Sequence, residues 1–425
     1  MNIRGHKSHD TVSFPLDIPD VKVNSVHQNE HGDYIITVES TQGYAICQHC
    51  GRQTTKFHGY SGWIQLRHLP ILGHRVYIRL RPKRYVCLYC AGKTTTQELG
   101  WYDAKSPHTK AYDQYLVVQL INSTVQDVSR KEDVGYEAVQ GALGRHIDTQ
   151  VNWAEFSELN VIGIDEIALT KGRRNFIAIL TTQQADGHVA VLTVLPDRSK
   201  TSVRQFLETI PPHLRPTLRT VCTDMWDGYV NAVQEFAADH ADVTLKVVVD
   251  RYHVAKNYRD GVDKIRKQEY RRLKKVLAPT DYAEIVQGTL WLVRQNHKDL
   301  TPDDCQKLRR LFAYAPELKL AYTFREELTA IFEMQLTTAQ ARTRLLKWAE
   351  KVRRSSLTGL DTFLTTLHNW LDEIVNYFVN RLSSGFVEGL NNKIKTIKRR
   401  CYGITRIITL FQRLYLDLEG YRRFA

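Results

Sequence analysis

Acidic residues in three separate segments of the sequence have the types and settings expected of metal-dependent chemistry. Asp165 lies in the apolar, β-branched run 161–169, Asp224 ends the similar run 219–224, and Glu388 lies near the start of a basic helical segment. A carboxylate on a buried strand is costly unless it is paired or binds a metal. Carboxylates that converge repel one another unless cations neutralise them, and such hard oxygen ligands suit Mg²⁺ or Mn²⁺.

Each of these acids also has a simpler explanation. Asp165 and its neighbour Glu166 could face water at the end of a strand, and Glu388 could merely complement a helix dipole. Neighbouring side chains of a strand point to opposite faces, so Glu166 is expected to orient nearby groups or to meet solvent. Partners for Asp165 elsewhere in the chain decide in favour of the metal interpretation.

Four of the seven cysteines form two C-x-x-C pairs, Cys47 with Cys50 and Cys87 with Cys90. Each pair can place two thiolates on a tight turn, and strand-like segments separate the pairs. This pattern predicts a zinc ribbon with one structural Zn²⁺, with redox-active pairs or unliganded thiols as the alternatives. The odd number of cysteines and the lack of a secretion signal indicate a reducing cytoplasm and argue against a disulfide framework.

The elements that must position the acids alternate between strands and helices after residue 160. Apolar, β-branched runs predict strands at residues 161–169, 175–182, 188–195, 219–224 and 244–250. Helices are expected on either side of the fourth strand, and the order β-β-β-α-β-α-β is that of a ribonuclease-H-like fold. In such a sheet the first and fourth strands are neighbours and the final helix packs across them, which would bring Asp165, Asp224 and Glu388 together.

The whole chain is expected to be a multidomain α+β protein. We divide it into a zinc-ribbon-like domain (1–105), a helix-turn-helix domain (106–155), the first part of a ribonuclease-H-like α/β catalytic domain (156–254), an all-helical insertion (255–380) and the last part of the catalytic domain with its final helix and basic tail (381–425). Trp291 in the insertion is interpreted as a core side chain in preference to one that stacks on a displaced base.

The charge of the chain favours a polyanionic partner, most simply nucleic acid. Its 425 residues carry a formal charge of +13, with a pI near 9.3. No run of 18 apolar residues is present, so a membrane span is not expected. The candidate DNA contacts are Tyr136, Gln140 and Arg145 of the helix-turn-helix, Lys256, Lys264 and Arg271 of a basic helix, and Asn391, Asn392, Lys395, Lys398 and Arg399 of the tail. A plain three-helix connector and solvated helix faces are the alternatives.

Several motifs together resemble the DDE transposases of bacterial insertion sequences, and most closely their ISL-three family. The matching runs are Gly163-Ile-Asp-Glu166, Thr223-Asp-Met-Trp-Asp-Gly-Tyr229, Asp250-Arg-Tyr-His253, Glu388-Gly-Leu-Asn-Asn-Lys-Ile-Lys395 and Lys398-Arg-Arg-Cys-Tyr-Gly403. The resemblance implies that Asp165, Asp224 and Glu388 form a catalytic triad that holds two Mg²⁺ or Mn²⁺ ions. Asp250 and His253 match the family's signature after the second aspartate. They are expected to hold the metal ligands in position without binding the metal themselves.

The resemblance implies a transposase that binds the terminal inverted repeats of an insertion sequence. It would hydrolyse a phosphodiester at each end and join the freed 3′-hydroxyl to double-stranded target DNA. Since two ends must be paired, a homodimer is expected, in the bacterial cytoplasm and associated with the nucleoid when bound to DNA. The alternatives are a structure-specific nuclease of the same fold without strand transfer, and a zinc-dependent DNA-binding regulator whose catalytic domain is vestigial.

Overall fold

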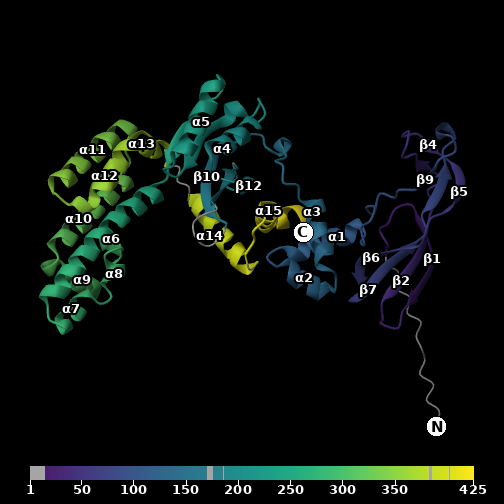
Figure 1. Cartoon of the computed structure of the whole chain (residues 1–425), viewed down its shortest axis with the longest axis horizontal. Helices are drawn as coiled ribbons and strands as arrows, with labels where there is room; N and C mark the ends of the chain where they lie inside the picture. The colour runs from purple at the N-terminus through teal and green to yellow at the C-terminus, as the bar shows by residue number, and fades with distance from the viewer. Residues whose placement is uncertain (1–14, 170–175, 185, 382–384, 402) are drawn as a thin grey trace, which may run out of the picture. The chain divides into compact units, whose positions relative to one another are not determined.

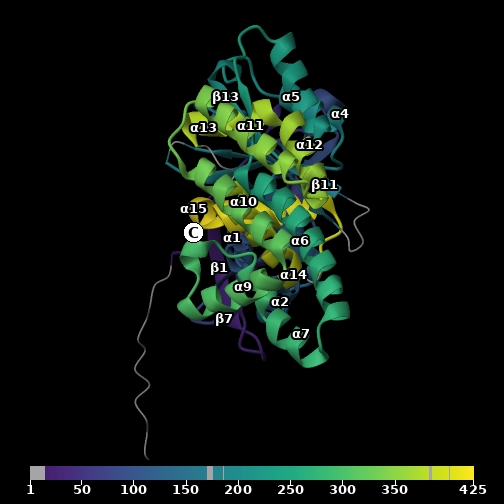
Figure 2. The same cartoon turned by 90° about the vertical axis from the view of Figure 1, so that its left-hand side faces the viewer.

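The computed structural model describes residues 15–169, 176–184, 186–381, 385–401 and 403–425, without the side chains of residues 380, 385–388 and 391 (Figure 1). The chain forms two compact units, one of Met1–Asp148 with Glu419–Ala425 and the other of Thr149–Leu418. Figure 2 shows the same elements from a second direction. Within the described residues, no helix is long and apolar enough to cross a membrane.

The first unit begins with β-structure that brings the cysteine pairs together. Its strands are β1 (Val21–Gln28), β2 (Tyr34–Ser40), β3 (Ala45–Ile46), β4 (Gln53–Thr54), β5 (Lys56–Tyr60), β6 (Ile64–Ile71), β7 (His74–Leu80), β8 (Lys83–Val86) and β9 (Thr94–Thr96). They form a four-stranded sheet in the order β1-β2-β7-β6, a two-stranded sheet β3-β4 and a three-stranded sheet β5-β8-β9. Alternate residues such as Ile36, Val38, Val76 and Ile78 bury one face of the four-stranded sheet, as the two-residue period of a strand requires.

Three short helices complete the described core of this unit: α1 (Lys110–Leu120), α2 (Val125–Glu132) and α3 (Tyr136–His146). Thr109 and Thr124 set the first two helix starts, because their hydroxyls accept hydrogen bonds from the backbone N–H of Tyr112 and Asp127. Asp133 ends α2 in the left-handed region with φ 51°, and this lets the chain turn directly into α3.

The second unit is built on a five-stranded sheet. Its elements, in chain order, are β10 (Asn160–Ala168), β11 (Phe176–Gln183), β12 (Val189–Leu195), α4 (Lys200–Glu208), β13 (Leu218–Thr223), α5 (Asp227–Asp239) and β14 (Lys246–Val249). The predicted succession of strands and helices is therefore present. The strand order is β12-β11-β10-β13-β14, with β10 antiparallel to β11 but parallel to β13, and β13 parallel to β14.

Both faces of this sheet are buried, which explains why its strands are nearly continuous apolar runs. Ile162, Val221 and Val247 pack with the buried side chains of α4 and α5 on one face. Their neighbours Val161 and Val248 belong to the core on the other face, which continues into the helices that follow β14. Asp165 has the parity of Val161, and Glu166 has the opposite parity.

A helical block joins the second face of the sheet (Figure 1). Its helices are α6 (Arg251–Val276), α7 (Pro279–Val286), α8 (Thr289–Leu292), α9 (Pro302–Tyr314), α10 (Pro316–Glu333), α11 (Thr338–Arg354), α12 (Asp361–Asn369) and α13 (Leu371–Asn380). Asn376 of α13 anchors the block to the sheet, because its amide donates a 2.9 Å hydrogen bond to the carbonyl of Val247. Two final helices, α14 (Gly385–Arg400) and α15 (Ile407–Phe424), follow the block.

Two details of the block bear on the sequence interpretation. Helix α6 runs very close to the turn around Gly359, where a Cβ atom would lie 2.5 Å from Cγ1 of Ile265, so this position requires glycine. The interpretation of Trp291 as a core side chain is wrong, because 66% of its surface is exposed. Its helix, α8, is only one turn long, too short for a buried face to be read from periodicity.

Candidate active site

Three aspartates follow one another across the ends of three adjacent parallel strands. The register pairs Gly163 of β10 with Cys222 of β13, and Thr223 of β13 with Val249 of β14. Continuing both ladders brings Asp165, Asp224 and Asp250 to the same level of the sheet. The sequence favours this alignment, because Asp224 and Asp250 directly follow the buried runs of β13 and β14, and Asp165 lies two residues beyond the last pair between β10 and β13.

These ends open into a cavity of about 520 Å³. Its lining combines four carboxylates with four basic side chains and one histidine: Asp165, Glu166, Asp224, Asp250, His253, Lys256, Lys395, Lys398 and Arg399. Asp165 is only 9% exposed and accepts a 2.6 Å hydrogen bond from the backbone N–H of Glu166. The cavity therefore gathers residues from the first, fourth and fifth strands and from two helices.

Asp224 is the most perturbed acid in the cavity. Burial, together with the nearby charges of Glu166 and Asp165, raises the pKa of its carboxyl from 3.8 to about 7, against the opposing effect of Arg198 and Lys256. Its Oδ1 atom is buried and has no hydrogen-bond partner among the described residues. A buried oxygen without a donor, beside two further carboxylates, fits a divalent cation, which would both satisfy the oxygen and offset the repulsion.

Glu166 has a partner that the sequence did not reveal. Arg198 Nη1 lies 2.9 Å from Oε2 of Glu166, just before α4. The same guanidinium lies 4.3 Å from the ring centroid of Trp226 and 4.7 Å from that of Phe176, within the range of a cation–π contact. Glu166 thus faces the side of the sheet opposite to Asp165, as strand parity predicts, yet it lines the same cavity because both lie near the strand end.

Asp250 and His253 form the start of α6. The Asp250 side chain caps the helix by accepting a 3.0 Å hydrogen bond from the backbone N–H of Tyr252. Burial lowers the pKa of His253, and the charges of Asp165 and Asp250 oppose this effect. The Asp-x-x-His spacing therefore places a cap and an imidazole on the first turn of a helix that borders the cavity.

Helix α14 lies against the end of β10 and supplies the basic side of the cavity. The ammonium group of Lys398 donates a hydrogen bond to the carbonyl of Ala168, and burial lowers the pKa of this lysine. Asn392, Lys395 and Arg399 are exposed residues of the same lining. The predicted site residues Glu388 and Asn391 belong to α14, but their side chains lie outside the described part of the structure.

The four cysteines of the C-x-x-C pairs converge in the first unit. The Sγ atoms of Cys47 and Cys90 lie 3.8 Å apart, those of Cys50 and Cys87 lie 3.7 Å apart, and all four lie within 4.8 Å of one another. A tetrahedral zinc with Zn–S bonds of about 2.3 Å has sulfur–sulfur edges of about 3.8 Å, so the arrangement fits a zinc ion and is too open for disulfides. Among the described residues, it is the only group of three or more potential ligands this tight.

One thiol of this cluster is predisposed to ionise. The backbone N–H of His49 donates a hydrogen bond to Sγ of Cys47 over 3.4 Å. This contact, with smaller contributions from Cys50 and Cys87 and against desolvation, lowers the pKa of Cys47 to about 7. The thiolate is the form that binds metal, so the turn favours the liganding state before any ion arrives.

The candidate DNA contacts of α3 differ from one another. Tyr136, at the helix start, is 46% exposed, whereas Gln140 is half-buried. Arg145 forms an ion pair within the unit, because its Nη2 lies 2.7 Å from Oδ2 of Asp113, a carboxylate that is 1% exposed. Asp113 also lies 2.9 Å from Nδ1 of His108, so Arg145 closes a buried network that joins α3 to α1.

The basic residues predicted on the helix after Asp250 lie along α6. Lys256, Lys264 and Arg271 are all exposed. Lys256 lines the acid cavity, whereas Lys264 and Arg271 lie two and four turns further along the same helix.

Comparisons with known proteins identify the class to which this architecture belongs. Residues 162–414 match the transposase family of the ISL3 type with a DDE motif, and residues 44–90 match the zinc finger of the transposases of IS204, IS1001, IS1096 and IS1165. The family match covers more than half of the chain and includes β10, β13 and α14. The chain belongs to the ISL3 family of transposases.

Individual relatives agree with this placement. The chain is 27% identical over 369 residues to the transposase for insertion sequence element IS1001 of Bordetella parapertussis, which covers 87% of both chains. It is 22% identical over 399 residues to the transposase for IS1557 of Mycobacterium tuberculosis, covering 88% of this chain and 86% of the relative. The crystal structure of the yeast mitochondrial Holliday junction resolvase Ydc2 matches 52% of this chain and 100% of its own, at 12% identity and a TM-score of 0.14, too low to support an argument.

The chain is therefore a transposase of an insertion sequence, with a zinc-ribbon segment and DNA as its partner. The predicted identity, function and zinc ribbon are confirmed at this level.

Proposed function

We propose that this transposase cleaves and joins DNA through a metal-dependent triad of Asp165, Asp224 and Glu388 in a ribonuclease-H-like domain. The observation that carries the proposal is the alignment of Asp165 and Asp224 at the ends of adjacent parallel strands, beside a buried carboxylate oxygen without a donor. The sheet order and its alternation with α4 and α5 support the fold assignment.

Glu388 is proposed as the third ligand from its position in the helix. Residue 388 lies one turn before Asn392 in α14, and Asn392, Lys395 and Arg399 follow the helical spacing that keeps one face directed at the cavity. Two bound Mg²⁺ or Mn²⁺ ions would activate a water or 3′-hydroxyl and stabilise the leaving oxygen of an in-line displacement.

The protein's own groups have separable tasks in this proposal. Asp165 and Asp224 are held rigid by the sheet and present their oxygens at one level, which fixes where a scissile phosphate must lie. Asp250 holds the first turn of α6 in place and so positions His253 and Lys256 at the rim. Lys395, Lys398 and Arg399 supply positive charge for the phosphates that flank the cut, and the amides of Asn392 and Asn391 of α14 would donate hydrogen bonds to them.

The first unit is proposed to recognise the terminal inverted repeats. The zinc ribbon and the helices α1–α3, as a helix-turn-helix, would dock α3 in a major groove, with Tyr136 and Gln140 nearest the bases. Arg145 is better suited to stabilise α3 against α1, because its guanidinium is already bound to Asp113. Lys264 and Arg271 extend the basic face of α6 along the DNA backbone.

The division of the chain into five functional segments, 1–105, 106–155, 156–254, 255–380 and 381–425, remains part of the proposal. So does a homodimer, since a reaction that joins two element ends requires two sets of triads or a shared one. Sedimentation of the protein with end DNA tests this directly, and a complex with one protein chain per two ends would contradict it.

The test of the triad is an excision assay in Mg²⁺ with Asp165→Asn, Asp224→Asn and Glu388→Gln. Each neutral variant keeps its shape but loses a charged ligand, so cleavage is expected to fall by several orders of magnitude, while end binding in EDTA is retained. Asp242→Asn, which removes an exposed carboxylate after α5, is the matched control and should cleave normally. Cleavage retained by all three triad variants would exclude the proposed site.

A further inference from the structure

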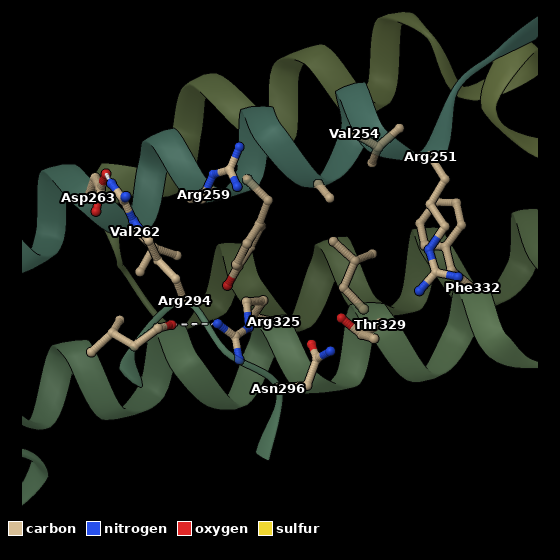
Figure 3. Close-up of a pocket in the computed structure, with 14 residues that line it drawn as sticks. Arg251, Val254, Arg259, Val262, Asp263, Arg294, Asn296, Arg325, Thr329 and Phe332 are labelled. Carbon is tan, nitrogen blue, oxygen red and sulfur yellow. Dashed lines mark hydrogen bonds and ion pairs between the residues drawn. The ribbon is translucent and has the colours of Figure 1, made fainter. Parts of the chain in front are cut away.

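A second cavity, of about 190 Å³, lies within the helical block between α6 and α10 (Figure 3). The segment after α8 closes one side of it with Val293, Arg294 and Asn296. Its floor is apolar, formed by side chains such as Val262 and Phe332, whereas its rim is rich in arginine. This space holds several water molecules and is large enough for a tetrahedral oxyanion.

Cations exceed acids around this cavity. Four arginines and a single carboxylate line it: Arg251, Arg259, Arg294, Arg325 and Asp263. Their ion-pair partners outside the lining add Arg266, Glu326 and Glu333. The full set therefore contains five cations and three carboxylates, a net charge of +2.

Two of the four arginines are held in fixed positions. Arg294 binds Asp263, and Arg325 donates hydrogen bonds to the carbonyls of Val293 and Gln295. In each of them the buried Nε–H has no acceptor among the described residues. Arg251 is only weakly engaged, with its Nη2 3.8 Å from Oε1 of Glu333.

Arg259 is the cation for which the fold supplies no partner. It is half-buried on α6 and makes no hydrogen bond or ion pair with any described residue. In Figure 3 Arg259 lies on α6, between Asp263 and Val254 along the helix. If these arginines served only to pack the block, a carboxylate or carbonyl acceptor would be expected beside Arg259, as it is beside Arg294 and Arg325.

The same two turns of α6 border both cavities. Tyr252, His253 and Lys256 line the acid cavity, whereas Arg251, Ala255 and Arg259 line the arginine-rich one. Arg259 follows Lys256 by three residues, about 4.5 Å along the helix axis. A ligand in the second cavity would therefore lie beside the same turns of α6 that border the acids.

We propose that the arginine-rich cavity of the helical block binds a phosphate group, through Arg259 and the other arginines that line it. The planar fork of arginine matches the oxygens of a phosphate, and an apolar floor strengthens such charge-assisted hydrogen bonds. The phosphate is either a phosphodiester of the DNA backbone or that of a small phosphorylated ligand. The DNA alternative rests on the proposed function, because it makes the cavity a second anchor for the strand held at the acids.

Phosphate binding is measured first, by calorimetric titration of the full-length protein with inorganic phosphate in EDTA. Arg259→Gln is compared with Arg344→Gln, which removes an exposed arginine of α11 that has no partner among the described residues. A hydrogen bond to a charged group is worth enough for a loss of about tenfold or more in Arg259→Gln, with no change in Arg344→Gln. Equal phosphate binding by the two variants would overturn the proposal.

The source of the phosphate is decided by duplex DNA binding at several salt concentrations. If the cavity holds a DNA phosphodiester, Arg259→Gln weakens binding to all sequences alike and lowers the salt slope by about one. If only inorganic phosphate binding is lost, the ligand is a small phosphorylated molecule.

The test of phosphate binding can be separated from the test of the proposed triad, because the two tests measure different properties. Asp224→Asn is expected to bind phosphate normally while losing cleavage. An Asp224→Asn protein that still cleaves, beside an Arg259→Gln protein that no longer binds phosphate, would remove the proposed triad and leave the phosphate site standing.

Discussion

Replacement of Asp224 by asparagine should stabilise the metal-free protein while it abolishes cleavage. Burial and two neighbouring carboxylates raise the pKa of Asp224 from 3.8 to about 7. In the metal-free folded protein this group holds a proton that the unfolded chain has already released between pH 4 and pH 7. The free energy of unfolding must therefore fall as the pH rises through this interval, and the loss is complete above about pH 8.

The magnitude follows from the size of the shift. A change of about three pKa units corresponds to about 4 kcal/mol, an upper limit because partial solvent access and relaxation reduce it. We expect Asp224→Asn to gain about 2 to 4 kcal/mol at pH 8 in EDTA and to gain nothing near pH 4. In a unit of this size, the gain corresponds to a rise in Tm of roughly 5–10 °C.

The assay is thermal unfolding in EDTA and in Mg²⁺, at pH 4.5 and pH 8, with Asp242→Asn as the control for loss of a single exposed charge. Mg²⁺ should raise the Tm of the natural protein at pH 8, since the ion removes the repulsion, and should raise that of Asp224→Asn much less. The reasoning is refuted if Asp224→Asn is less stable than the natural protein at pH 8 in EDTA, or if Mg²⁺ stabilises both proteins equally.

Three further outcomes are expected. Glu166→Gln should keep measurable cleavage where Asp165→Asn keeps none, since Glu166 is committed to an arginine; equal losses in the excision assay would make it a fourth metal ligand. Arg145→Met should destabilise the first unit by about 2 to 4 kcal/mol in urea unfolding, because it leaves the carboxylate of Asp113 buried without its cation; a change near zero would refute that role. Zinc chelation or Cys87→Ser should unfold the first unit and abolish end binding, with the sheet unit intact by circular dichroism; unchanged end binding would contradict the role of the ribbon.

Much of the fold near the acids could be predicted because the local signals are redundant. The β-branched runs of β10, β13 and β14 each end at or carry an aspartate, and the parallel register then aligns those aspartates without further information. The C-x-x-C pairs could be recognised from local sequence in the same way, since a tight turn and a glycine suffice to place two sulfurs close together. Predictions of this kind depend on residues adjacent in sequence.

The interactions that escaped prediction depend on packing between distant segments. Arg198 lies 32 residues from Glu166, in a connection whose sequence has no motif, and only the meeting of β10 with the start of α4 pairs them. Trp291 is predicted to be a core side chain, but it is largely exposed, and the guanidinium of Arg294 lies 5.5 Å from its ring centroid. Exposure of a large side chain follows from the arrangement of neighbouring helices, which no local pattern records.

The two cavities that α6 borders differ in the net charge of their linings, and therefore in whether they attract the DNA backbone without a metal. Around the acids, four carboxylates offset four lysines and arginines, so the described lining has no net attraction for a phosphate until divalent cations add their charge. The arginine-rich cavity, with its ion-pair partners, already carries +2 without any metal. If the phosphate bound there belongs to DNA, the metal-free transposase should hold the DNA backbone through the helical block, and the scissile phosphate should enter the acid cavity only when the metal binds. Such an order of events would protect the DNA, because contact with the backbone alone would not expose a phosphodiester to an active triad.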